Sequence, residues 1–135
     1  MVTQFVNNMM WEGKKSVSYS IFYDAMDKIE SRISENPHEV WKKALENVMP
    51  GVEVRSKRIG GATFQIPTEI RPSRKLSIGM KWIIKFSRAR SGKGMAEKLS
   101  AELIAASKGE GASVKRREDT HKMAEANRAF AHFRA

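Results

Sequence analysis

At residues 52–66 the chain reads VEVRSKRIGGATFQI, and this stretch decides the fold. Apolar and polar side chains alternate on both sides of the pair Gly60-Gly61, which is the two-residue period of a β-strand. Two adjacent glycines tolerate the positive φ angles that a tight hairpin turn requires. The sequence therefore predicts a two-stranded β-hairpin, here called the ribbon, over about residues 52–70.

Helices are predicted on both sides of the ribbon, because apolar residues there recur at three- and four-residue steps. In the third helix, Asn36 is expected to cap the N-terminus and Pro37 to occupy the first helical position. The expected fold class is mainly α: a six-helix bundle with a two-stranded β-hairpin protruding between helices three and four. The predicted helices cover residues 2–13, 16–34, 36–50, 72–90, 95–109 and 114–133.

The apolar pattern also predicts which surfaces are buried. Apolar residues cover a wide arc of the fourth helix, so this helix is expected to be the central, most buried one. The sixth helix, capped by residues 111–113, is expected to turn Met123, Ala126, Phe130 and Phe133 towards the core. Tryptophan and phenylalanine side chains fall on such helical stripes and are expected in the core. Phe64 on the ribbon is left open as a base-stacking platform.

The charge balance points to a polyanionic partner. The 135 residues include 25 Lys and Arg against 15 Asp and Glu, a net charge of +10. Residues 1–50 hold 6 basic and 7 acidic side chains, so the whole excess lies in residues 51–135. Nucleic acid is the first partner that such an excess favours, and an anionic membrane surface the second. The length is that of one domain, residues 1–135.

The ribbon and its surroundings supply the first candidates for phosphate contacts. An arginine guanidinium fits two phosphate oxygens at once, and lysine supplies a point charge. The alternative is a charged edge strand that prevents aggregation, with some cations bracing the base of the ribbon. The candidates in this region are Arg55, Lys57, Arg58, Gly60, Gly61, Arg71, Arg74 and Lys75.

A second group of candidates opens the last helix. Lys115, Arg116 and Arg117 lie where a helix carries partial positive charge, so a bound phosphate would relieve an unfavourable arrangement. The alternative is a solvated face balanced by Glu118 and Asp119. Lys122, Arg128 and Arg134 continue along the same helix, while Lys14, Lys15 and Lys93 are weaker candidates in connecting segments.

Catalytic and membrane functions find no support in the sequence. The absence of cysteine excludes disulfides and thiolate catalysis, and is compatible with a reducing cytoplasm. Residues 92–94, GKG, lack the remaining pattern of a nucleotide-binding loop. His121 and Glu125 lie one turn apart, but two ligands without a third make a poor metal site. No apolar run approaches the roughly 20 residues of a membrane span. We expect no enzyme activity, cofactor, metal or membrane partner.

Several short stretches stand in a distinctive order along the chain: GKKS at 13–16, EVRS at 53–56, QIP at 65–67, EIRP at 69–72 and KRRED at 115–119, continued by HKMAEANRAFAH at 121–132. Together they resemble the bacterial family of small-subunit ribosomal protein seven. The resemblance implies a helical bundle with a protruding ribbon. Two departures stand out: the basic leader usual in the family does not precede Met1, and Ala135 replaces the usual tryptophan after Arg134.

The resemblance also implies a function. The family binds the 3′ major domain of small-subunit rRNA early and nucleates assembly of the subunit head, with the ribbon close to exit-site tRNA and mRNA. Expected partners are this rRNA and neighbouring head and platform proteins, in the small ribosomal subunit of the cytoplasm. The rival interpretation is a nucleoid-type DNA-binding protein, which would prefer duplex DNA over structured rRNA.

Overall fold

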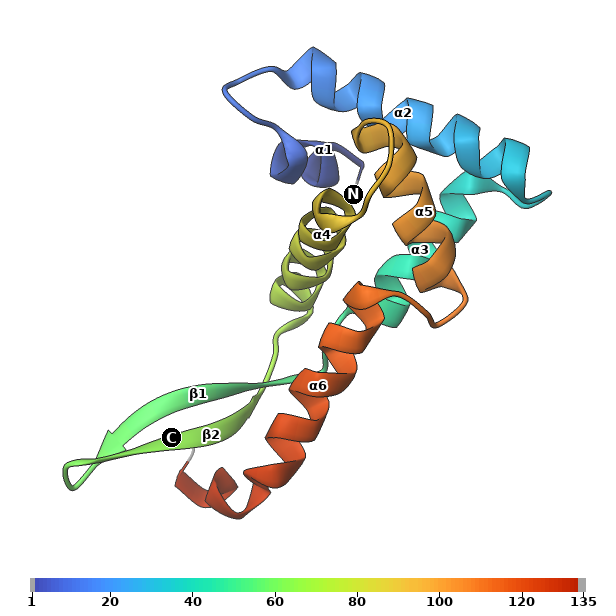
Figure 1. Cartoon of the computed structure of the whole chain (residues 1–135). Coiled ribbons are helices and arrows are strands. Elements are labelled where there is room, and N and C mark those ends of the chain that lie inside the picture. The colour runs from blue at the N-terminus through green and yellow to red at the C-terminus, as the bar shows by residue number, and fades with distance from the viewer. Residues whose placement is uncertain (1, 134–135) are drawn as a thin grey trace.

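The computed structural model describes residues 2–133, with side chains up to residue 130. A helical body carries a long, two-stranded ribbon that projects from one end (Figure 1), which confirms the predicted fold class. None of the described helices is both long and apolar enough to cross a lipid bilayer. The elements are α1 (Val2–Met9), α2 (Lys15–Arg32), α3 (Pro37–Val48), β1 (Val52–Ile59), β2 (Ala62–Glu69), α4 (Pro72–Ala89), α5 (Met95–Ser107), α6 (Ala112–Ala126) and the 3₁₀-helix η1 (Arg128–Phe133).

The centre of the body is α5 and not, as the sequence predicted, α4. Helices α2, α3, α4 and α6 all pack against α5. Small buried residues of α5, such as Ser100 and Ala106, allow these helices to approach it closely, and Leu99 and Leu103 are fully buried. In α4 the stripe that contains Met80, Ile83 and Ile84 is buried, but Ile78, Trp82 and Phe86 are only half-buried. A wide apolar arc therefore did not make α4 the innermost helix.

The end of the body opposite the ribbon is held by an aromatic cluster. The ring centroids of Phe5, Phe22 and Trp41 lie 5.4–5.7 Å apart, with Trp41 edge-on to both phenylalanines. The Asn36 side chain accepts a hydrogen bond from the backbone N–H of His38 (3.0 Å), which confirms the predicted cap of α3. Helix α1 ends at Met9, before Gly13. Trp11, just beyond that end, is 68% exposed and does not belong to the core.

The ribbon is a regular antiparallel hairpin. Pairing runs from Val52 opposite Glu69 to Ile59 opposite Ala62, which leaves Gly60-Gly61 as a two-residue turn. Both glycines have positive φ (57° and 86°), as a type I′ turn demands. Val52, Glu53 and Val54 at the base of the ribbon are half-buried, and the turn at its tip is exposed.

The last helix differs from its prediction. α6 ends at Ala126, and the chain continues as η1, which lies along β2 (Figure 1). Met123 and Ala126 are exposed, and the buried positions are Ser113, Val114 and Ala124. Phe130 faces the ribbon instead of the core, with its ring 5.2 Å from that of Phe64. The side chain of Phe133 lies outside the described residues.

The hairpin turn yields a prediction about backbone conformation. No heavy atom lies within 4 Å of a Cβ added at Gly60 or Gly61, so a substitution there acts through φ alone. Gly61→Val should weaken the ribbon by about 1–2 kcal/mol, because a β-branched residue resists positive φ. Gly60→Asn should be nearly neutral, since Asn-Gly suits this turn. Hydrogen exchange of the cross-strand amides measures both effects; equal protection in the two variants would contradict the turn assignment.

Candidate nucleic-acid interface

The ribbon presents cations on both of its faces. Arg55, Lys57 and Arg58 are exposed on β1. The register places Arg55 and Lys57 on the face that carries Ile66 and Phe64, and Arg58 on the opposite face. Phe64 itself is half-buried and packs against Phe130, so its ring is engaged within the protein.

A carboxylate at the base of the ribbon binds two of the predicted cations. Glu53 accepts two hydrogen bonds from the Arg74 guanidinium (3.0 and 3.1 Å) and one from Arg55 (3.0 Å). The Arg74 hydrogen bond is the main reason why the pKa of Glu53 lies below its usual value, against the opposing effect of burial. The pKa of Arg74 is raised in turn by this carboxylate. Arg74 thus ties β1 to α4, as the bracing alternative proposed.

Two contacts from α6 hold the strand at its root. The Arg117 Nε donates to the backbone carbonyl of Met49 (3.3 Å), and the His121 Nε2 accepts from the backbone N–H of Gly51 (3.0 Å). The pKa of His121 is lowered, first by burial and then by the charge of Arg117. Arg117, a candidate for phosphate contact, is therefore half-buried and engaged with the backbone that leads into the ribbon.

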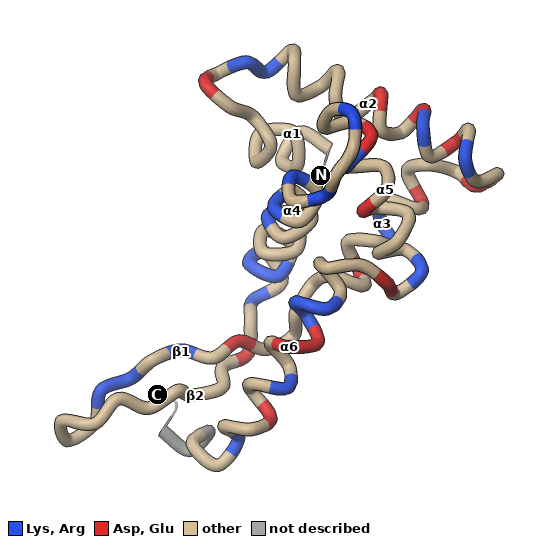
Figure 2. Tube along the Cα trace, in the orientation of Figure 1, with Lys and Arg blue, Asp and Glu red and all other residues tan. Residues whose placement is uncertain are grey.

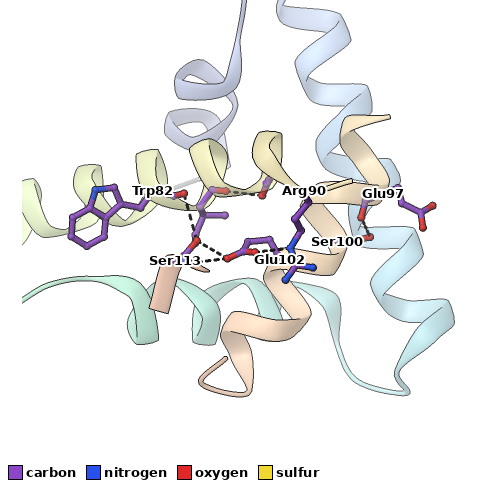
Figure 3. A network of polar contacts seen from close by, with 8 residues as sticks. Trp82, Arg90, Glu97, Ser100, Glu102 and Ser113 are labelled. Carbon is purple, nitrogen blue, oxygen red and sulfur yellow. Dashed lines mark hydrogen bonds and ion pairs between the residues drawn. The ribbon is translucent and has the colours of Figure 1, made fainter. Parts of the chain in front are cut away.

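The start of α6 is fixed by a buried carboxylate (Figure 3). Glu102 of α5 is fully buried and accepts hydrogen bonds from the Ser113 backbone N–H (3.1 Å) and hydroxyl (2.7 Å). Its other oxygen accepts from the Arg90 Nε at 2.7 Å. Gly111, the N-cap, has φ of 93°, and a Cβ there would lie 3.1 Å from the Glu102 Oε1. One side chain thus joins α4, α5 and α6.

This network supplies an anion of the protein's own at the N-terminus of α6, where the sequence favoured a bound phosphate. The Glu102 carboxylate accepts from the Ser113 N–H in the first turn, and its negative charge there offsets part of the cost of the cations that follow. Lys115 and Arg116 remain exposed on the outer side. The Arg116 guanidinium carbon lies 5.6 Å from the centroid of the Trp82 ring, so this arginine rests on α4.

A row of cations along α4 was missed in the sequence. Arg74, Lys81, Lys85 and Arg88 follow each other at steps of seven, four and three residues, which places them on one side of the helix. We call these four residues the α4 cationic face. Lys and Arg recur along α4 and β1 (Figure 2), and the ion pair between Arg74 and Glu53 joins the two elements. The three- and four-residue spacing was the available signal.

The remaining candidates are more dispersed. Arg71 precedes α4 and is exposed, Lys75 is half-buried in its first turn, and Lys122 is exposed on α6. Arg128 forms an exposed ion pair with Glu125 (2.9 Å). Lys14, Lys15 and Lys93 lie at the opposite end of the body from the ribbon, in or beside the connecting loops; Arg134 lies outside the described residues.

Metal binding gains no support from the arrangement of side chains. Among the described residues, no three His, Asp or Glu side chains lie close enough to hold an ion. His121, the one histidine considered for a ligand pair, directs its Nε2 at the Gly51 N–H. Its role in the described structure is to position the ribbon.

Comparison with known proteins gives consistent matches along the whole chain. A family model described as ribosomal protein S7p/S5e matches residues 1–128. A protein of Cytophaga hutchinsonii named small ribosomal subunit protein uS7 is 63% identical over 99% of this chain and 86% of its own length. Proteins of the same name from Flavobacterium psychrophilum (61% identical, 99% and 87% covered) and a Thermoanaerobacter species (54%, 98% and 85%) are also similar.

The buried carboxylate leads to a prediction of stability. Glu102→Ala should lower the free energy of unfolding by about 3 kcal/mol, because it leaves the buried Ser113 N–H and the Arg90 guanidinium without their acceptor. Glu97→Ala on the same helix is the matched control: its ion pair with Arg32 is exposed, so the loss should stay below about 1 kcal/mol. Urea unfolding measures both, and similar losses would contradict the role assigned to Glu102.

The contact between His121 and Gly51 leads to a prediction of pH dependence. The folded-state pKa of His121 lies below the usual 6.5, so the unfolded chain binds a proton first as the pH falls. Stability from this group is present above pH 6.5 and is lost on acidification below it. His121→Asn offers an acceptor that does not titrate, so its melting temperature should drop less between pH 7.5 and 5.5. An equal drop in both proteins would assign the pH dependence to other groups.

Proposed function

The chain belongs to the S7p/S5e family of ribosomal proteins, and from this premise we propose that it is an rRNA-binding structural constituent of the small ribosomal subunit. The observation that carries the proposal is the continuity of exposed cations from the ribbon through the junction at Arg71 onto the α4 cationic face. Helix α4 holds no acidic residue and the ribbon holds only Glu53 and Glu69, whereas acidic side chains are exposed along α2, for example Asp24, Asp27 and Glu30. A polyanion has one favourable side on which to dock.

The proposed mechanism is electrostatic scaffolding. Lysine and arginine side chains displace the counterions of folded rRNA, and the rigid body holds the RNA segments in a fixed relative position. Helical RNA is recognised mainly by its shape, phosphates and 2′-hydroxyls, which a row of cations on a helix can follow. The function needs no catalytic residue, and we assign none.

We divide the candidate cations into two roles according to their contacts. We assign phosphate contacts to the half-buried Lys75 and to eight exposed cations: Lys57, Arg58, Arg71, Lys81, Lys85, Lys115, Arg116 and Lys122. Arg55, Arg74 and Arg117 act as positioning residues, because each donates to an acceptor at the base of the ribbon. Arg128, Lys14, Lys15 and Lys93 are weaker contributors, and the tip Gly60-Gly61, which has no side chains, allows close approach of an RNA backbone.

The resemblance supports finer proposals. We place the contact in the 3′ major domain of the rRNA, where binding nucleates assembly of the subunit head, with residues 1–135 acting as one unit in the cytoplasm. The ribbon, as the longest projection, is the element that reaches towards exit-site tRNA and mRNA. Neighbouring head and platform proteins then contact surfaces that the rRNA leaves free.

The test compares two double variants of equal charge. Lys57→Gln with Arg58→Gln removes two ribbon cations, whereas Lys42→Gln with Lys43→Gln removes two exposed cations of α3. The ribbon variant should bind a transcript of the 3′ major domain more weakly. Its plot of log affinity against log salt should also flatten by about 0.7–0.9 for each phosphate that the ribbon no longer neutralises. Filter binding at several salt concentrations measures both quantities.

The control variant separates specific contacts from net charge. Lys42→Gln with Lys43→Gln should leave the salt slope unchanged, and both double variants should melt like the original chain, because all four side chains are exposed. Equal slopes in the two variants would remove the ribbon from the interface. Tighter binding to duplex DNA than to the transcript would favour the nucleoid-type interpretation.

A further inference from the structure

A site that combines an exposed aromatic ring with cations lies at the end of the body opposite the ribbon. Trp11, in the loop between α1 and α2, is 68% exposed, the largest exposed fraction among the exposed large apolar side chains of the described residues. Val17, in the first turn of α2, is 51% exposed. Single exposed apolar residues are common, but these two line one groove. Neither packing in the core nor the ribbon explains why these two apolar side chains are exposed.

The Trp11 ring is held by an arginine that is itself fixed. The Arg88 guanidinium carbon lies 4.5 Å from the centroid of the Trp11 ring, and its Nη2 donates to the backbone carbonyl of Met9 (3.0 Å). Arg88 is half-buried, so it has little freedom to swing away. The guanidinium covers one face of the indole, and the large exposure of Trp11 leaves the other face to solvent. The result is a flat aromatic platform beside a positive charge.

The groove next to this platform is mostly apolar and has a cationic rim. Its volume is about 450 Å³, and its walls include Met9, Val17, Ile21 and Met95. Lys14, Arg88 and Lys98 line it against a single acid, Glu12. Glu12 lies 3.9 Å from Lys14 in a solvent-exposed pair, which offsets little of that charge.

These features together favour a nucleotide as the occupant. A base has a flat aromatic surface that stacks on an indole, and its phosphate needs cations at the rim of the same site. An apolar protein helix would use the walls but not the three cations. Arg88 also belongs to the α4 cationic face, so the groove continues the surface assigned to RNA.

We propose that an unpaired RNA nucleotide stacks on the open face of Trp11 and extends into this groove, with its phosphate against Lys14 and Lys98. The inference rests on the RNA-binding function proposed above and adds a stacking site to it. Phosphate contacts along α4 carry no preference for single strands, whereas this site accepts only a base that is free of a helix. The groove therefore selects an unpaired position next to the RNA helices that the cationic surface binds.

The test uses the full chain and three single variants. Trp11→Ala should weaken binding of a 3′ major domain transcript and of a single-stranded adenylate hexamer by about tenfold, the effect of losing one stacked base. Trp11→Phe should retain most of the affinity, because it keeps a ring. Tyr23→Ala is the matched control, since Tyr23 is a 50% exposed aromatic of α2 that does not line the groove; its affinity should equal that of the original chain.

Salt dependence distinguishes stacking from charge. The Trp11 ring carries no charge, so its removal does not change the number of phosphates that the protein neutralises. Trp11→Ala should therefore lower the affinity without changing the slope of log affinity against log salt. Full affinity of Trp11→Ala for both RNAs, or an equal loss in Tyr23→Ala, would overturn the inference while leaving the proposed function intact. Failure of the original chain to bind the transcript would overturn the proposed function, and the hexamer would still test the groove. An effect of Trp11→Ala on a protein partner alone would also overturn the inference.

Discussion

The buried carboxylate of Glu102 is the contact on which the arrangement of the whole molecule depends. A charged group without solvent exposure is stable only when its acceptor sites are occupied, and here Arg90 from the end of α4 and Ser113 from the start of α6 occupy them. The three hydrogen bonds offset the cost of burial and leave one relative placement of the three helices. The direction of α6 is thereby fixed, and α6 in turn positions the ribbon.

The ribbon depends on this chain of contacts because a two-stranded hairpin is marginal by itself in water. Arg117 and His121 on α6 hold the backbone at Met49 and Gly51, Glu53 ties β1 to α4 through Arg74, and η1 lies along β2. These contacts involve the root and the middle of the ribbon and leave the tip exposed. A projection of this length can present cations to RNA only if its direction is fixed in advance, because ordering it on binding would reduce the affinity.

The role of each cation consequently depends on the acceptor that its side chain contacts, and not on its position in the sequence. Arg74 and Arg117 lie among the most cationic stretches, yet they donate to Glu53 and to a backbone carbonyl. Arginine also rests on tryptophan twice along α4, at Arg116 with Trp82 and at Arg88 with Trp11. In both pairs the charge stays at the surface while its direction is fixed, which suits a partner that is recognised by shape.

The sequence by itself determined the local elements and the kind of partner. The alternating pattern around Gly60-Gly61 specified the hairpin, Asn36-Pro37 specified a helix start, and the uneven charge pointed to nucleic acid, because each of these depends on neighbours in the chain or on totals. Tertiary structure alone decided the rest. Four features depend on which faces of distant segments come together: the central position of α5, the binding of Glu102 at the start of α6, the exposure of Met123 and the contact of Trp11 with Arg88. Periodicity shows that a helix has an apolar side, but not what packs against it, and a charge shows no partner until the fold brings one within hydrogen-bonding distance.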